Sequence, residues 1–131
     1  MAQSKGWNLD EWIVPSGRIK GRRVTVSDSA TPTFDALQGN DFFQSTSQSG
    51  ITLQVPTSAP GTGLSQTLRY TIYCNTTTTT LAADTASTGG FKYTAAVPSL
   101  PTLSNTQYVD IIMSYQQQAS RWIFEAINVY S

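Results

Sequence analysis

The alternation of apolar and polar residues predicts short β-strands along most of the chain after Arg23. A strand with one buried face places apolar side chains at every second position, and turn-forming Gly, Pro, Asn and Asp residues separate such runs here. The expected strands cover residues 24–26, 33–37, 42–45, 51–55, 66–74, 91–94, 105–115 and 121–129. No longer stretch shows the 3.6-residue period of a helix. We therefore predict an all-β fold, an antiparallel β-sandwich or jelly roll, with an extended N-terminal arm.

The last of these segments, residues 105–129, is expected to form a hairpin in which both faces are apolar. A turn at 116–119 places Tyr115 opposite Ser120 and fixes the register. On one face Val109, Ile111 and Met113 then oppose Ala126, Phe124 and Trp122; on the other, Tyr108, Ile112 and Ser114 oppose Ile127, Ile123 and Arg121. A sheet face open to water should be polar. We therefore expect another subunit to cover the second face, with Tyr108, Ile112, Ile123 and Ile127 at the interface.

The first 23 residues differ from the rest of the chain and predict a docking arm. They contain five basic and two acidic residues, a net +3, whereas residues 24–131 contain three basic and six acidic residues, a net −3. Tryptophan and arginine are the residues that most often anchor interfaces. The chain therefore divides into an arm, residues 1–23, and a β-sandwich domain, residues 24–131. The expected partner contacts are Trp7, Trp12, Arg18, Lys20, Arg22 and Arg23; a disordered leader is the alternative.

The amino-acid composition of the chain narrows the classes of partner that it is expected to bind. Charged residues make up 12% of the chain, against about 25% in an average protein. A surface of Thr, Ser and Gln fits one that partners cover or one exposed outside cells. Net charge is zero, which gives no general attraction to nucleic acid or membrane, and no apolar run reaches the ~18 residues of a membrane span. Cys74 is the only cysteine, and alternation in residues 66–74 places it on one face with Leu68, Tyr70 and Ile72, with Arg69, Thr71 and Tyr73 on the other. We therefore expect a buried, unreactive thiol.

Residue types also limit the chemistry. The chain has no histidine, which excludes the usual Ser-His-Asp, Cys-His and zinc sites, and it has no phosphate-binding or dinucleotide-binding loop. The predicted register places Asp110 opposite Glu125, at a separation that would suit a retaining glycosidase. Pairing of these carboxylates with Arg121, Arg69 or Lys92 at an interface is the simpler interpretation. We therefore expect no enzyme activity, catalytic residue, metal or cofactor.

Several short segments resemble a β-sandwich module of tailed-bacteriophage tail fibres and tailspikes. The segments that carry the resemblance are 24–28, 33–40, Phe42, 51–53, Pro60-Gly61, 68–72, Phe91-Lys92, 101–104, 108–110 and Arg121-Trp122. Together they extend over about residues 24–129. Such modules are usually trimers, so the resemblance implies a homotrimer.

In fibres, this module resembles the terminal head of a long chain with a shaft, whereas here a short basic arm precedes it. That arrangement looks more like a capsid decoration (cement) protein, which would bind and stabilise the major capsid protein on the exterior of the virion. The alternative is a receptor-binding tail fibre or tailspike head. In that case the loops 56–63 and 81–90 would bind host surface glycan.

Overall fold

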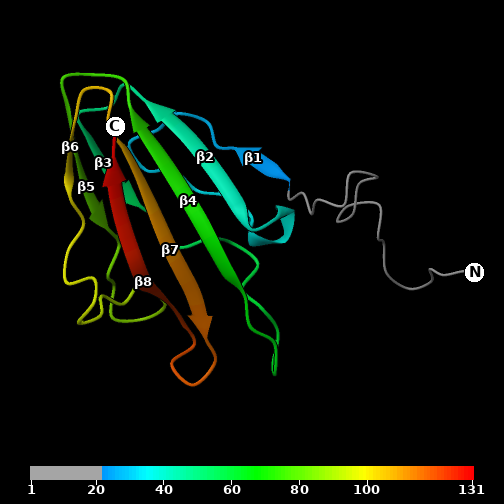
Figure 1. Ribbon diagram of the computed structural model, residues 1–131. Helices are drawn as coiled ribbons and strands as arrows, with labels where there is room; N and C mark the ends of the chain where they lie inside the picture. The colour runs from blue at the N-terminus through cyan, green and yellow to red at the C-terminus, as the bar shows by residue number, and fades with distance from the viewer. Residues whose placement is uncertain (1–21) are drawn as a thin grey trace, which may run out of the picture.

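The computed structural model describes residues 22–131, which form two β-sheets (Figure 1). The larger sheet has the strand order β1-β2-β4-β7-β8, and the smaller sheet has the order β3-β5-β6. The strands are β1 (Arg23–Thr25), β2 (Asp41–Thr46), β3 (Gly50–Leu53), β4 (Thr67–Cys74), β5 (Thr78–Ala83), β6 (Thr102–Ser104), β7 (Tyr108–Gln116) and β8 (Arg121–Tyr130); a 3-10 turn, η2, spans Ala36–Gln38. The all-β prediction is confirmed. In the described part of the chain, no helix is long and apolar enough to span a membrane.

The strand pairing is mixed, so the prediction of antiparallel sheets is wrong for half of the pairs. β1–β2, β2–β4 and β3–β5 are parallel, whereas β4–β7, β5–β6 and β7–β8 are antiparallel. The parallel pairs β2–β4 and β3–β5 arise because the chain changes sheet at each step from β2 to β5. A strand that returns after a passage through the other sheet runs in its original direction, as a crossover connection requires.

Both sheets contribute to one hydrophobic core. Phe42, Ile72 and Ile111 of the larger sheet and Ile51 and Leu103 of the smaller sheet are at most 2% exposed. In β4 the four alternating residues predicted to share one face, Leu68, Tyr70, Ile72 and Cys74, are all buried. The prediction of a buried Cys74 thiol is therefore confirmed.

Two expected strands take other forms. Residues 33–37 do not form a strand, because the Asp35 side chain accepts a bond of 2.9 Å from the backbone N–H of Leu37 and starts the 3-10 turn η2. Asp35 itself makes only an isolated bridge with Thr57. Residues 91–94 likewise provide only an isolated bridge, between Lys92 and Ile123 of β8.

The β7–β8 hairpin forms, but its predicted register is wrong. Tyr115 pairs with Trp122 instead of Ser120, because the turn lies at residues 117–120, one residue later than expected. A β-bulge then adds Glu125 to β8, so that Met113 pairs with Phe124 but Ile112 pairs with Ala126. The list of pairs continues with Ile111–Ile127, Asp110–Asn128, Val109–Val129 and Tyr108–Tyr130.

Candidate interaction face

The outer face of the five-stranded sheet brings together side chains from distant parts of the sequence. It lies opposite the core face, because core residues alternate with outward ones along each strand. The strand registers place its residues in three rows: Arg23, Asp41, Arg69, Ile112 and Ala126; Thr25, Phe43, Thr71, Asp110 and Asn128; Ser45, Tyr73, Tyr108 and Tyr130. All of these are exposed or half-buried except Thr71. We call this surface the outer face.

Three tyrosines form one row across β4, β7 and β8. The ring centroids of Tyr73 and Tyr108 are 4.6 Å apart, and those of Tyr108 and Tyr130 are 5.3 Å apart with nearly parallel planes. Aromatic pairs of this kind contribute about 0.5–1.5 kcal/mol beyond their buried area. The row therefore forms a fixed aromatic ridge, which ends at Tyr130 on the edge strand β8.

A polar cluster lies beside this ridge. The Asp110 carboxylate accepts bonds from the Thr71 hydroxyl, at 2.7 Å, and from the Tyr130 hydroxyl, at 3.0 Å. Burial and then the bond to Asp110 raise the pKa of Tyr130, so its hydroxyl stays protonated and keeps donating. The cluster therefore holds the end of the aromatic ridge in place.

Two arginines on the outer face also contact neighbouring side chains, one an acid and the other an aromatic ring. The Arg69 guanidinium donates two bonds to Asp41, at 3.1 and 3.3 Å. This contact with Asp41 is the main cause that raises the pKa of Arg69, against a smaller opposing effect of burial. The Arg23 guanidinium lies 4.4 Å from the ring centroid of Phe43, within cation–π range. Paired charges and aromatic rings make this a surface that a protein partner can cover at low electrostatic cost.

The loop 56–63 and residues 84–90 lie at the end of the molecule that carries the β7–β8 turn (Figure 1). The predicted loop 81–90 is shorter than expected, because residues 81–83 belong to β5. The Gln117 side chain donates to the Gly61 carbonyl at 2.7 Å. The Arg121 side chain donates to the carbonyls of Gly90, at 2.8 Å, and Ala86, at 2.5 Å. The hairpin turn therefore holds together the loops expected to bind glycan in the receptor-binding alternative.

Arg22, the first described residue, lies near the loop that precedes β4. A Cβ on Gly39 would be 3.6 Å from the Arg22 carbonyl, and the Gln66 side chain donates to the Gly39 carbonyl at 3.1 Å. Gln66 in turn ends the loop that precedes β4. Arg22 therefore lies close to this loop.

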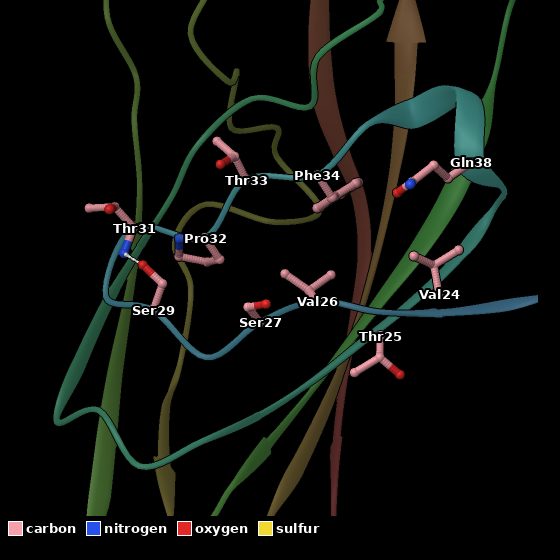
Figure 2. Close-up of a pocket in the computed structure, with 10 residues that line it drawn as sticks. All are labelled: Val24, Thr25, Val26, Ser27, Ser29, Thr31, Pro32, Thr33, Phe34 and Gln38. Carbon is pink, nitrogen blue, oxygen red and sulfur yellow. Dashed lines mark hydrogen bonds between the residues drawn. The ribbon is translucent and has the colours of Figure 1, made fainter.

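A hollow of about 270 Å³ lies beside β1 and the segment that follows it (Figure 2). Val26 and Phe34 line its base, and the hydroxyl residues Ser27, Ser29 and Thr31 lie around it. The Ser29 hydroxyl accepts a bond of 3.0 Å from the Thr31 backbone N–H. None of the residues that line the hollow is ionisable. Within residues 22–131, the hollow therefore has no ionisable side chain that could act as an acid or base.

Asp110 and Glu125, which the sequence analysis placed opposite each other, do not pair. Asp110 pairs with Asn128, and the added residue of the bulge moves Glu125 to a position where it accepts a bond of 2.5 Å from the Ser114 hydroxyl. Each carboxylate thus has its own donor. Among residues 22–131 no cluster of three His, Cys, Asp or Glu side chains could hold a metal ion.

Three of the four predicted interface residues lie on the outer side of the five-stranded sheet, and the fourth does not. Tyr108 and Ile112 are half-buried on the outer face. Ile123 pairs with Ser114 and is half-buried on the same side of the sheet, one row further along. Ile127 is not on it, because the bulge sets Ile127 opposite Ile111 and packs it against the core.

Of the predicted partner contacts, Arg22 and Arg23 are exposed at the start of the domain. Trp7, Trp12, Arg18 and Lys20 lie outside the described residues. Sequence reasoning missed Tyr73, Tyr130 and Phe43 as parts of the face. Alternation marked the Tyr73 position as opposite to the buried face of β4, but it gave no sign of which strands would lie side by side.

The chain matches no protein-family model, no curated protein and no solved structure. What the molecule does is therefore inferred from its outer face, its loops and its arm.

Proposed function

We propose that this protein is a bacteriophage capsid decoration (cement) protein, a homotrimer that binds and stabilises the major capsid protein shell on the exterior of the virion. The observation that carries the proposal is the outer face, which is broad and aromatic, holds the Arg69–Asp41 ion pair, and is left uncovered by the described residues. The proposal keeps the β-sandwich class, with mixed sheets in place of antiparallel ones. It assigns no catalytic residue and no cofactor.

The outer face has the composition of a surface that another protein covers. Protein interfaces are enriched in tyrosine and arginine, and unpaired charges are depleted at their centres. Here Tyr73, Tyr108 and Tyr130 supply rigid aromatic area, and Arg69 is already neutralised by Asp41. Ile112 and Ile123 add apolar area on the same side of the sheet, beyond the Asp110 row. A neighbouring subunit of the trimer is the partner that we assign to this face.

The mechanism is adhesion. Burial of apolar surface contributes about 25 cal/mol per Å², and three linked subunits convert weak single contacts into tight attachment. The tryptophans and basic residues of the arm would supply the contacts with the shell. A shell bridged in this way resists the outward pressure of packaged DNA.

Gold-labelled antibody on intact virions, viewed by electron microscopy, tests the location. The proposal expects label in a regular array over the head. Purified protein should also bind isolated heads, and deletion of residues 1–22 should abolish that binding while the domain stays folded. Label confined to the tail tip, or head binding that survives the deletion, would contradict the proposal.

The receptor-binding tail fibre head remains a second proposal, because one observation favours it. Gln117 and Arg121 gather the loop 56–63 and residues 84–90 at one end of the molecule, where Leu64 is 61% exposed. Such a loop cluster could bind host surface glycan. In this case deletion of residues 1–22 should leave binding to host cells intact, and Gln117→Ala should weaken it. Head binding without any binding to cells would reject this proposal.

A further inference from the structure

The C-terminal half of β8 is an open sheet edge. β8 is the last strand of the five-stranded sheet and pairs only with β7 among the described strands. Along its first half, the backbone of Lys92 bonds with Trp122 and Phe124 and covers the outer edge. Beyond Phe124 no other described segment makes a backbone bond with that edge. Residues 126–130 therefore present strand backbone groups that an added strand could pair with.

This edge lacks the features that usually protect sheet edges. Natural edge strands are kept from pairing by short length, charged residues, proline or a covering segment. β1 has three residues and includes Arg23, and the backbone of Ala30 and Pro32 covers the outer edge of β3. In contrast, the residues 126–130 are Ala-Ile-Asn-Val-Tyr, with no charge, no proline and no glycine. Val129 and Tyr130 are each 40% exposed. An edge of this kind is suited to accept a strand.

We propose that residues 11–14 of a neighbouring copy add to this edge as a further strand, so that the arms exchange between subunits of the trimer. This inference rests on the trimer of the proposed function. The segment Glu11-Trp12-Ile13-Val14 has the β-branched and aromatic residues that favour strands, and Pro15 ends it. Its length is sufficient to pair residues 12–14 with residues 128–130 of the open edge. The assignment gives Trp12 to a neighbouring subunit and leaves Trp7 and the basic residues of the arm for the shell.

The distance across the sheet favours a neighbouring copy over the same chain. The described chain enters the sheet at β1, and a strand added outside β8 would lie five strand spacings away, about 24 Å. The linker of residues 15–21 spans at most about 25 Å when fully extended, and it would have to pass over side chains such as Tyr108. A β8 edge of another copy beside this β1 is within easy reach. Contacts of this head-to-tail kind close into a ring when the rotation from copy to copy completes a full turn, and a trimer is such a ring.

An antiparallel pairing extends both faces of the sheet. With Trp12 beside Tyr130, the row of Tyr73, Tyr108 and Tyr130 gains a fourth aromatic ring. Ile13 then lies beside Val129, on the side of the sheet that carries the buried Val109. The added strand therefore covers an exposed aromatic side chain and an exposed aliphatic one.

Disulfide trapping tests the pairing. We would mix equal amounts of two single variants, Ile13→Cys and Val129→Cys, let the subunits exchange, and oxidise them mildly. Directly paired strand positions lie within disulfide distance. The expected result is a linked dimer of the two variants, at about tenfold or more above a control in which exposed Thr102→Cys replaces Val129→Cys. The native Cys74 is fully buried, and each variant alone serves as a further control.

Each result that would contradict the proposal points to a different alternative. Linkage only within single chains of the Ile13→Cys/Val129→Cys double variant would show that the arm binds its own sheet. Linkage of Val129→Cys alone, to itself, would show that two β8 edges pair directly. Either result would overturn the arm exchange. The arm exchange would also be overturned if the trimer, measured by sedimentation equilibrium, persisted after deletion of residues 1–14. That result would not contradict the trimer of the proposed function. A monomeric wild-type chain would instead overturn the trimer of the proposed function.

Discussion

At the scale of single residues, Asp28 organises a polar network that extends into the core. Its carboxylate accepts bonds from the Gln44 side chain, at 3.0 Å, and from the backbone N–H and hydroxyl of Ser47, at 3.0 and 3.1 Å. Gln44 is fully buried and accepts a bond from the Tyr70 hydroxyl. Burial, followed by the negative charge of Asp28, raises the pKa of Tyr70. A buried network of this kind stabilises the fold only while every member is paired.

The ionisation of Asp28 should make stability depend on pH. Burial alone would raise the pKa of this carboxyl, but bonds from Ser47, Thr46 and Gln44 outweigh it and lower the pKa from 3.8 to about 2. A lowered folded-state pKa stabilises the protein fully above the unfolded value of 3.8, and this contribution is lost as pH falls toward about 2. Asp28→Asn should lower the free energy of unfolding by about 1–2 kcal/mol at neutral pH. Urea unfolding followed by tryptophan fluorescence measures both effects.

The variant Asp84→Asn is the matched control for this prediction. Asp84 accepts a bond of 3.0 Å from the backbone N–H of Ala86, and an asparagine oxygen can accept the same bond. Its stability should follow that of the wild type. If the wild type and Asp28→Asn lost stability equally between pH 3.8 and pH 2, the role assigned to Asp28 would be wrong.

At the scale of elements, the loop before β6 depends on a glycine with no room for a side chain. A Cβ on Gly90 would lie 2.4 Å from the backbone nitrogen of Ala86, which is closer than atoms can approach. The Arg121 side chain bonds both residues and holds this loop against β8. The close approach of the two backbone segments therefore requires glycine at position 90.

Gly90→Ala should lower the free energy of unfolding by about 1–3 kcal/mol, because the backbone must move to relieve the overlap. Thermal unfolding and amide hydrogen exchange of residues 84–91 would detect the loss and locate it. Gly61→Ala is the control, since its Cβ would meet only a Leu64 methyl group at 3.9 Å. Equal stability of the two variants would show that the loop can rearrange without cost.

How far sequence predicts these elements depends on whether the signal is local. Alternation placed Leu68, Tyr70 and Ile72 correctly on one face of β4, because the period of a strand is a property of the strand itself. The predicted hairpin register was wrong, because the register depends on the position of the turn and on a bulge at Glu125, which no local sequence pattern indicates. Parallel pairing was missed for a similar reason, because it follows from how the chain passes between the sheets.

The candidate site shows the same limit. Tyr73, Tyr108 and Tyr130 lie far apart in the sequence, and only the strand order β4-β7-β8 places them in one row. Sequence reasoning predicted an apolar second face on the hairpin, and it identified Tyr108 on that face. It could not identify the aromatic ridge, because a row across a sheet requires knowledge of which strands are neighbours.

At the scale of the whole molecule, the outer face and the open edge form one continuous surface. The aromatic ridge ends at Tyr130, which is also the last residue of the unprotected half of β8. A neighbour that covers the face therefore also reaches the edge. Such continuity is expected of a surface used for self-assembly, where contacts gain strength by acting together.

Substitutions at two adjacent residues of β7 should distinguish an effect on trimer assembly from an effect on folding. Ile111 points into the core and is fully buried, whereas Ile112 is half-buried on the outer face beside Arg69. Ile111→Thr should lower the free energy of unfolding by about 2–4 kcal/mol, because it leaves a cavity and buries a hydroxyl. Ile112→Thr should change the stability of the subunit by less than about 1 kcal/mol, since threonine is a good strand residue at a partly exposed position.

The same Ile112→Thr change should weaken the trimer, because it replaces apolar area at the proposed subunit interface by a hydroxyl. Sedimentation equilibrium over a range of concentrations measures this as a rise in the trimer dissociation constant of about tenfold or more, which equals about 1.4 kcal/mol. Circular dichroism of the same samples shows whether the subunits stay folded. A wild-type chain that stays monomeric at every concentration would contradict the interface, because Tyr108, Ile112 and Ile123 would then face water in the native state.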